Sequence, residues 1–190
     1  DNLDVKNKER RKITEICMDE ARNQVQDHSR FGTDLESLLF VASETWPPGI
    51  LGLIAGRLVD EFGRPAVAVN LGQSISKGSA RSIEQFDISA ALEREQDLLI
   101  RFGGHHQAAG FTLLTENLSS LKRRMGHHAK QYLENIELVS SINIDFMAPP
   151  ESVTDPATLS FIGSLEPFGK FNPQPLFWGR GLEVIRSSSV

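Results

Sequence analysis

The sequence predicts an α/β fold, in which a sheet domain built on a β-α-β unit follows a long helix and precedes a small β segment. Apolar runs of strand length at 38–42 and 64–71 flank a helical pattern at 49–58. A strand, a helix and a strand within about thirty residues form a β-α-β unit by default. A second helical pattern leads into the glycine-rich segment 101–111, and residues 3–28 carry helical spacing throughout.

Composition limits the kind of protein that this chain can form. Its 190 residues suffice for one ordinary domain and part of another, and 39% of them are hydrophobic. The net charge of −5 disfavours a general nucleic-acid binder but permits a narrow basic groove. The single cysteine, Cys17, excludes an internal disulfide and favours a reducing, cytoplasmic location. No apolar run reaches the ~18 residues of a membrane span, so we expect no membrane partner. We also expect a cytoplasmic monomer.

The first half of the chain alternates helices and strands. Residues 3–28 form an amphipathic helix, and 38–42 form a buried strand. Pro47 and Pro48 end that strand and suit the first turn of a helix over 49–58. The next strand covers 64–71. The charged N-terminus lacks a signal peptide and an initiator Met, which indicates a piece of a longer chain.

The second half continues with further elements of both kinds. Asp87 is the expected N-cap of a helix that runs to Ile100, and Thr154 or Asp155 the expected N-cap of a helix that runs to Leu165. The best domain boundary falls at 147–151. The other expected elements are a polar strand or turn at 77–82, a strand at 110–114, an amphipathic helix at 118–132, a half-buried strand at 142–146, a rigid turn-rich loop at 166–175 and a strand at 182–185.

The glycine-rich segment is the first candidate site. Gly103 and Gly104 allow positive φ angles and expose backbone N–H groups, which are the usual material of an anion-binding loop. His105, at the expected tip, could bind a phosphate, move a proton or ligate a metal. A histidine that is merely satisfied inside a tight turn explains the residue equally well, and spacing alone leaves the choice open.

Two further segments offer groups for a phosphate or a base. Ser79 and Arg81 stand two residues apart, so on a strand they share a face, where a hydroxyl and a guanidinium fork suit a phosphate. Trp46 could stack on a base, although tryptophan is more often a core residue. The helix that begins near Gly49 presents free N–H groups and a positive dipole end to an anion.

Several of these motifs resemble a known family. Gly-Gly-His-x-x-Ala-Ala-Gly at 103–110 is similar to the signature of the DHH-associated domain of the DHH phosphoesterases. Within that superfamily the RecJ exonucleases are the best match. The segments that carry this resemblance are the linker-like 3–11, Trp-x-Pro-Gly-Ile-Leu-Gly at 46–52, Gly-Ser-Ala-Arg-Ser-Ile at 78–83 and Glu-Pro-Phe-Gly-x-x-Asn-Pro at 166–173.

The resemblance implies a division of the chain and a set of site residues. Residues 1–29 would be an interdomain linker helix, 30–147 a DHH-associated substrate-binding domain, and 148–190 the connection and the start of an oligonucleotide-binding (OB) fold. His105 would be catalytic, reaching the substrate phosphate. The residues implied to bind phosphate or DNA are Trp46, Gly49, Ser79, Arg81, Ser82, Gly103, Gly104 and His105.

The resemblance also implies a function. The parent protein would hydrolyse single-stranded DNA from 5′ to 3′ in repair and recombination, using Mn²⁺ or Mg²⁺ held by an upstream DHH catalytic domain in cis. No metal ligands are expected in this chain, which alone would be inactive. The alternatives are a DHH oligoribonuclease or cyclic-dinucleotide phosphodiesterase, and a non-catalytic nucleic-acid-binding scaffold.

Overall fold

The computed structural model describes residues 2–30, 36–136, 138, 142–169 and 172–181. The chain divides into two compact units, Asp1–Val139 and Ser140–Val190. The domain limits given above, with a boundary after residue 147, stay predictions. In the described residues no helix is both long enough and apolar enough to cross a membrane.

Unit 1 is built on a five-stranded sheet in the order β1-β2-β3-β5-β4. The strands are β1 (Leu39–Ser43), β2 (Ala66–Asn70), β3 (Ile75–Arg81), β4 (Leu99–His105) and β5 (Ala108–Leu114). β1 and β2 are parallel and are joined through α2 (Leu51–Phe62), which confirms the β-α-β unit. The other neighbouring pairs are antiparallel.

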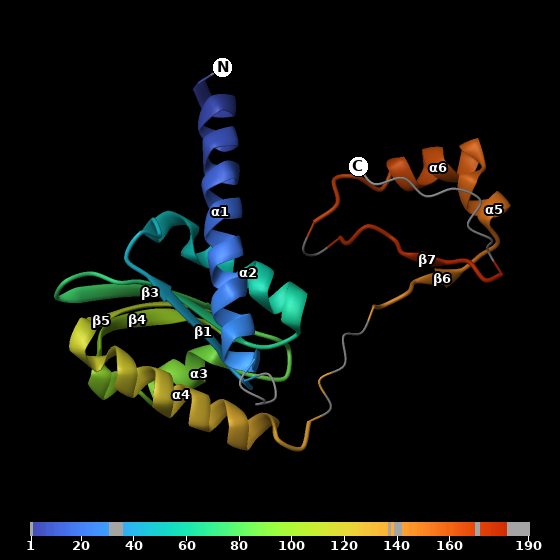
Figure 1. Ribbon diagram of the computed structural model, residues 1–190. Helices are drawn as coiled ribbons and strands as arrows, with labels where there is room; N and C mark the ends of the chain where they lie inside the picture. The colour runs from blue at the N-terminus through green and yellow to red at the C-terminus, as the bar shows by residue number, and fades with distance from the viewer. Residues whose placement is uncertain (1, 31–35, 137, 139–141, 170–171, 182–190) are drawn as a thin grey trace. The chain divides into compact units, whose positions relative to one another are not determined.

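α1 (Asn2–Arg30) and α2 cover one face of the sheet (Figure 1). Apolar side chains at helical spacing on α1, among them Met18 and Ala21, pack with those of α2 and with the inward residues of β1 and β2. A short 3-10 turn, η1 (Pro48–Ile50), leads into α2, and Gly63 ends it in the left-handed conformation with φ of 62°. The N-terminal half of α1 projects beyond the sheet, and its residues from Val5 to Ile13 are exposed.

The opposite face carries α3 (Ile88–Glu93) and α4 (Leu118–Leu133), with short 3-10 turns η2 (Gln96–Leu98) and η3 (Thr115–Asn117) between elements. Their apolar residues form a second core with Val67, Ala80 and Phe111 of the sheet. Asp87 caps α3 as predicted, because its carboxylate accepts a hydrogen bond from the backbone N–H of Ala90 at 2.9 Å.

The glycine-rich segment departs from the expected loop. The helix predicted to reach Ile100 ends at Glu93, and residues 99–114 form a β4–β5 hairpin because the pairing of the two strands outweighs the helical preference of 94–100. The expectation of positive φ at Gly103 and Gly104 is wrong, since among the described glycines only Gly63 and Gly181 have it. The close backbone approach is present: a Cβ at Gly104 would lie 2.3 Å from the carbonyl oxygen of Ala108.

Unit 2 contains β6 (Phe146–Met147), α5 (Pro150–Thr154), α6 (Pro156–Gly163) and β7 (Phe177–Trp178), and β6 pairs with β7. Asp155 is the N-cap of α6, accepting from the backbone N–H groups of Ala157 and Thr158. The half-buried strand expected at 142–146 is wrong, because Ile142 is 73% exposed and only Phe146 belongs to a strand. The strand expected at 182–185 lies outside the described residues.

Candidate nucleic-acid interface

The candidate site is the sheet surface beside α2. α2 packs against β2 and β3, while Arg101, Gly103, His105 and Gly110, which share that face on β4 and β5, are exposed. The strand register sets these residues in three rows across β3, β5 and β4. The rows are Arg81–Ala108–His105, Ser79–Gly110–Gly103 and Lys77–Thr112–Arg101.

These rows enclose a groove with a small, open centre and a basic rim. A cavity of about 470 Å³ lies over it, bordered by Pro48 of η1, by Leu51 of α2 and by the second and third rows. The central row has no side chain larger than serine, whereas the flanking rows carry Lys77, Arg81 and Arg101. At a rise of about 3.4 Å per residue, the outer rows lie about 14 Å apart, which is room for more than one phosphate of an extended strand.

Arg81 is held in place by its neighbours on β3. Its Nη1 donates to Ser79 Oγ at 3.2 Å and to the carbonyl oxygen of Ala80 at 2.9 Å. Within the described residues, Lys77, Arg81 and Arg101 have no acidic partner within ion-pair distance. Three uncompensated positive charges around a small-residue floor make an anion the natural occupant.

A glycine of α2 makes room for this arrangement. A Cβ at Gly52 would lie 2.8 Å from Arg81 Nη2 and 3.3 Å from Ser79 Oγ. Gly52 therefore packs closely against the side chains of Arg81 and Ser79. Gly56, one turn later on α2, would place a Cβ with no heavy atom within 4 Å.

This difference gives a matched pair of variants. Gly52→Ala should push the flexible Arg81 guanidinium from its place and weaken binding of a single-stranded oligonucleotide by about tenfold, the loss of one good charged contact. Gly56→Ala gains the same helix propensity, up to about 1 kcal/mol, and should leave affinity unchanged. Fluorescence titration of both variants checks this. Equal affinities would show that Gly52 does not position Arg81.

His105 lies at the end of β4, in the same row as Arg81. Adjacent strands lie about 4.8 Å apart, so the two backbones are about 10 Å apart across β5. The backbone N–H of Gln107 donates to His105 Nδ1 at 3.4 Å. Because Nδ1 accepts this bond, Nε2 is the ring nitrogen left to donate a hydrogen bond to a ligand. The imidazole is exposed, and its role as a phosphate ligand stays a prediction.

The hairpin that carries His105 is tied to the loop between β3 and α3. The N–H of Ser82 donates to the carbonyl oxygen of Gln107 at 3.0 Å, and the N–H of Ile88 donates to that of His106 at 3.1 Å. These backbone bonds fix the position of His105 relative to β3. The imidazole is therefore presented by a hairpin anchored at its tip.

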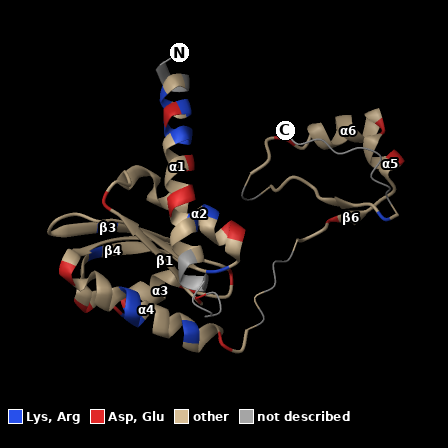
Figure 2. Ribbon diagram, viewed as in Figure 1, with Lys and Arg blue, Asp and Glu red and all other residues tan. Residues whose placement is uncertain are grey.

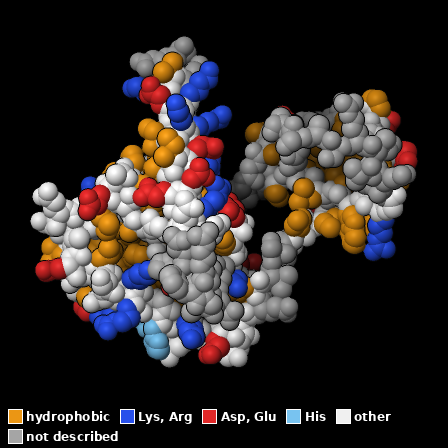
Figure 3. Space-filling view, viewed as in Figure 1, with side chains coloured by type: hydrophobic (Ala, Val, Ile, Leu, Met, Phe, Trp, Pro, Cys, Tyr) orange, Lys and Arg blue, Asp and Glu red, His pale blue; other side chains and the backbone are white. Residues whose placement is uncertain are grey.

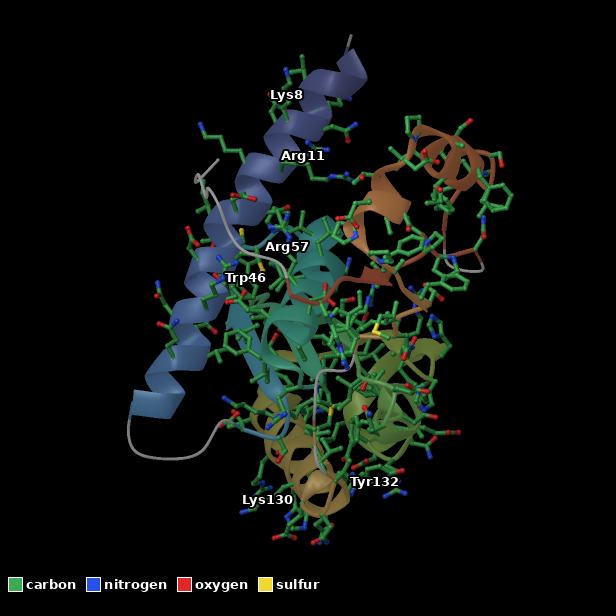
Figure 4. All side chains as sticks on the ribbon, turned by 90° about the vertical axis from the view of Figure 1, so that its right-hand side faces the viewer. Lys8, Arg11, Trp46, Arg57, Lys130 and Tyr132 are labelled. Atoms are coloured by element: carbon green, nitrogen blue, oxygen red, sulfur yellow. The ribbon has the colours of Figure 1, made fainter. Side chains whose placement is uncertain are left out.

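Two of the predicted substrate contacts are wrong. Trp46 has no exposed surface, packs between α1 and α2, and donates its indole N–H to Glu20 Oε2 at 2.7 Å, so it cannot stack on a base (Figure 4). Ser82 is buried and donates its hydroxyl to the carbonyl oxygen of Phe86 at 2.6 Å. Both residues support the fold. Gly49 is exposed in η1, and its contact with substrate stays a prediction.

The structure adds groove residues that sequence reasoning missed. Lys77 and Thr112 are paired across β3 and β5, and Arg101 follows across β4. A signal for two of them was present, because Lys77 precedes Ser79 by two and Arg101 precedes Gly103 by two. On a strand, that spacing puts each pair on one face.

The described residues contain no group of three or more His, Cys, Asp or Glu side chains arranged to hold a metal ion. The groove offers basic and hydroxyl groups instead, which suit the phosphate of a substrate and not a divalent cation. What this surface can do chemically is bind an extended polyanion and offer one imidazole N–H to it.

Comparison with known proteins places this geometry in a family. The DHHA1 domain model matches residues 36–131. The chain is 35% identical over 175 residues to the single-stranded-DNA-specific exonuclease RecJ of Bacillus subtilis, covering 91% of this chain and 22% of that protein. It is 30% identical over 183 residues to the Escherichia coli RecJ, covering 93% of this chain and 31% of the relative.

A solved structure agrees. RecJ from Thermus thermophilus in complex with Mg²⁺ superposes with a TM-score of 0.74 at 26% identity, over 93% of this chain and 26% of that one. The same protein has been solved with Mn²⁺, with a TM-score of 0.75 at 25% identity. The chain thus spans between about a fifth and a third of the length of these relatives.

Proposed function

The chain belongs to the DHHA1 domain family, and from that premise we propose that it is the substrate-binding part of a RecJ-like exonuclease that degrades single-stranded DNA from 5′ to 3′. The observation that carries the proposal is the groove over β3, β5 and β4, where Lys77 and Arg101 line the cavity beside a floor of small residues. Arg81 lies in the adjoining row, on the other side of that floor. Its similarity to the RecJ proteins over nine-tenths of the chain supports the same assignment.

In this proposal the groove holds the DNA backbone along the strands. The Arg81 fork and the Ser79 hydroxyl bind one phosphate, and Lys77 and Arg101 bind a neighbouring one. His105 donates its Nε2–H to a phosphate oxygen whose negative charge grows during hydrolysis. The narrow groove accepts a single strand and excludes a duplex, and binding through phosphates makes the affinity independent of base sequence.

The metal-dependent chemistry belongs to another part of the protein. Two Mn²⁺ or Mg²⁺ ions would activate the attacking water and stabilise the leaving group. Because the described residues hold no set of ligands for them, this chain's share is binding and positioning, and it should hydrolyse nothing alone. With that activity we also propose a role in DNA repair and recombination, as a cytoplasmic monomer.

The binding proposal is tested with the 190-residue chain and an oligothymidylate. We expect weak binding whose log affinity falls with log salt at a slope of about −1.4, since each of the two phosphates neutralised on a single strand contributes about 0.7. A duplex of the same length should bind less tightly. Tighter binding of the duplex would contradict the narrow groove. A separate experiment on the longer enzyme, with DNA and RNA substrates of increasing length, distinguishes an exonuclease from an oligoribonuclease.

A further inference from the structure

A second basic surface lies on the other side of the sheet, along α4. Residues 118–133 contain Lys122, Arg123, Arg124 and Lys130 with His127 and His128, and no Asp or Glu, although the whole chain carries a net charge of −5. Figure 2 shows these cations along α4, and in Figure 3 a histidine lies between Lys and Arg side chains at the lower edge of unit 1. Nothing in the proposed groove uses them.

These side chains border a cavity. It measures about 580 Å³ and is lined by Arg94 and Glu95, which follow α3, together with Arg123, Arg124, His127 and His128 of α4. Its size falls within the roughly 300–1,000 Å³ of small-molecule sites. The groove of the first site is on the opposite face, because Ala80 and Phe111 point into the core under α3 and α4, whereas Ser79 and Gly110 alternate with them.

An ionic network centred on the buried carboxylate of Glu95 lies at the cavity. Glu95 is 1% exposed; it forms an ion pair with Arg124 Nε, and its Oε1 lies 3.4 Å from His128 Nδ1. Arg124 also donates from Nη1 and Nη2 to the two oxygens of Asp97, at 2.9 and 3.0 Å. This fork lowers the pKa of Asp97. The charge of Arg124 is thereby matched by two carboxylates, and the network links the segment after α3 to the middle of α4.

Three of the side chains that line the cavity have no partner among the described residues. The side chains of Arg94, Arg123 and His127 are exposed and form no hydrogen bond or ion pair within the described residues. Two guanidinium groups and an imidazole that line one cavity, beside this ionic network, can wrap the oxygens of a single phosphate. A solvent-exposed face of α4 would account for Arg123 and His127, but it would not account for Arg94, which follows α3.

We propose that Arg94, Arg123 and His127 form a second phosphate-binding site, separate from the groove over β3, β5 and β4. The ligand chemistry is a phosphate monoester or diester, whose source is either a free mononucleotide or the backbone of a nucleic acid. The inference stands on the α3–α4 cavity alone and does not depend on the proposed nuclease function.

The test is an NMR titration of the whole 190-residue chain with three probes: inorganic phosphate, thymidine 5′-monophosphate and an oligothymidylate. We expect shifts of the Arg94, Arg123 and His127 signals with every probe. The double variant Arg94→Ala, Arg123→Ala should weaken that binding by at least about tenfold, since it removes both guanidinium contacts. It should melt like the parent chain, because the Glu95–Arg124–Asp97 network is untouched.

A charge-matched control is Lys8→Ala with Arg11→Ala. It also removes two positive charges, from the projecting half of α1, at the opposite end of unit 1 from Lys130 and Tyr132 of α4 in Figure 4. Full binding at the cavity in this control, with loss in the first variant, supports the site. Equal affinity for the monophosphate and the oligonucleotide then identifies a free nucleotide as the source, and tighter oligonucleotide binding identifies the backbone. Unshifted signals with all three probes, or equal loss in both variants, would overturn the proposal.

Discussion

Replacing His105 with alanine is expected to lower kcat by about 10²–10³-fold in the metal-dependent exonuclease to which we assign this chain. His105 Nδ1 accepts a hydrogen bond from the Gln107 N–H, which leaves Nε2 to donate, and His105 lies in the row that also contains Arg81. A donor that strengthens as charge grows on a phosphate oxygen acts mainly on the transition state, and loss of one such donor has effects of about this size. KM should change little.

Folding should survive this substitution. No described residue other than glycine has a positive φ, so alanine fits the backbone at position 105, and the His105 side chain is exposed. His106→Ala is the matched control, because His106 is an exposed neighbour whose backbone carbonyl, and not its imidazole, holds the hairpin tip. Steady-state kinetics and a thermal melt are measured for both. Unchanged kcat in a His105→Ala enzyme that melts normally would mean that the His105 side chain takes no part in catalysis and that the hairpin only shapes the groove.

Trp46→Ala should destabilise the fold and spare the groove. The indole is fully buried between α1 and α2, and its N–H bonds to Glu20. Removing a large buried aromatic side chain costs about 3–5 kcal/mol in the free energy of unfolding. Trp46→Phe keeps most of the apolar contact and loses the hydrogen bond, so it should cost about 1–2 kcal/mol.

Urea unfolding followed by circular dichroism measures these costs. Oligonucleotide affinity, measured where both variants are folded, should match that of the parent chain. An alanine variant of normal stability with impaired DNA binding would restore the base-stacking role that the structure argues against.

The elements that sequence reasoning located correctly are those with a local signal. The alternation of charged and apolar residues on α1, the proline-marked start of α2 and the caps at Asp87 and Asp155 each follow from residues close together in the chain. The β1-α2-β2 unit then follows from connection rules. In each case residues close together in the sequence are enough to predict the element.

The predictions that were wrong share a different cause: contacts between residues far apart in the sequence determine the structure at these positions. The sequence predicts a helix that ends at Ile100 and a phosphate-binding loop that starts at Arg101, but the pairing of β4 with β5 turns residues 99–114 into two strands of the sheet. Trp46 lies in a motif similar to that of a DNA-processing family, yet its environment is set by Glu20 on α1, 26 residues earlier. Lys77, Arg101 and Thr112 become one site only when the sheet register is known.

The central claim is that the open sheet face binds single-stranded DNA through its phosphates, and Arg81 tests it most directly. Arg81→Lys keeps the charge and loses the planar fork, so it should weaken oligothymidylate binding by the 190-residue chain by about tenfold, and in the longer enzyme it should mainly raise KM. Arg11→Lys, the same change on the exposed part of α1, is the control and should bind as the parent does. An Arg81→Lys chain that binds oligothymidylate as tightly as the Arg11→Lys control would contradict the assignment of this face.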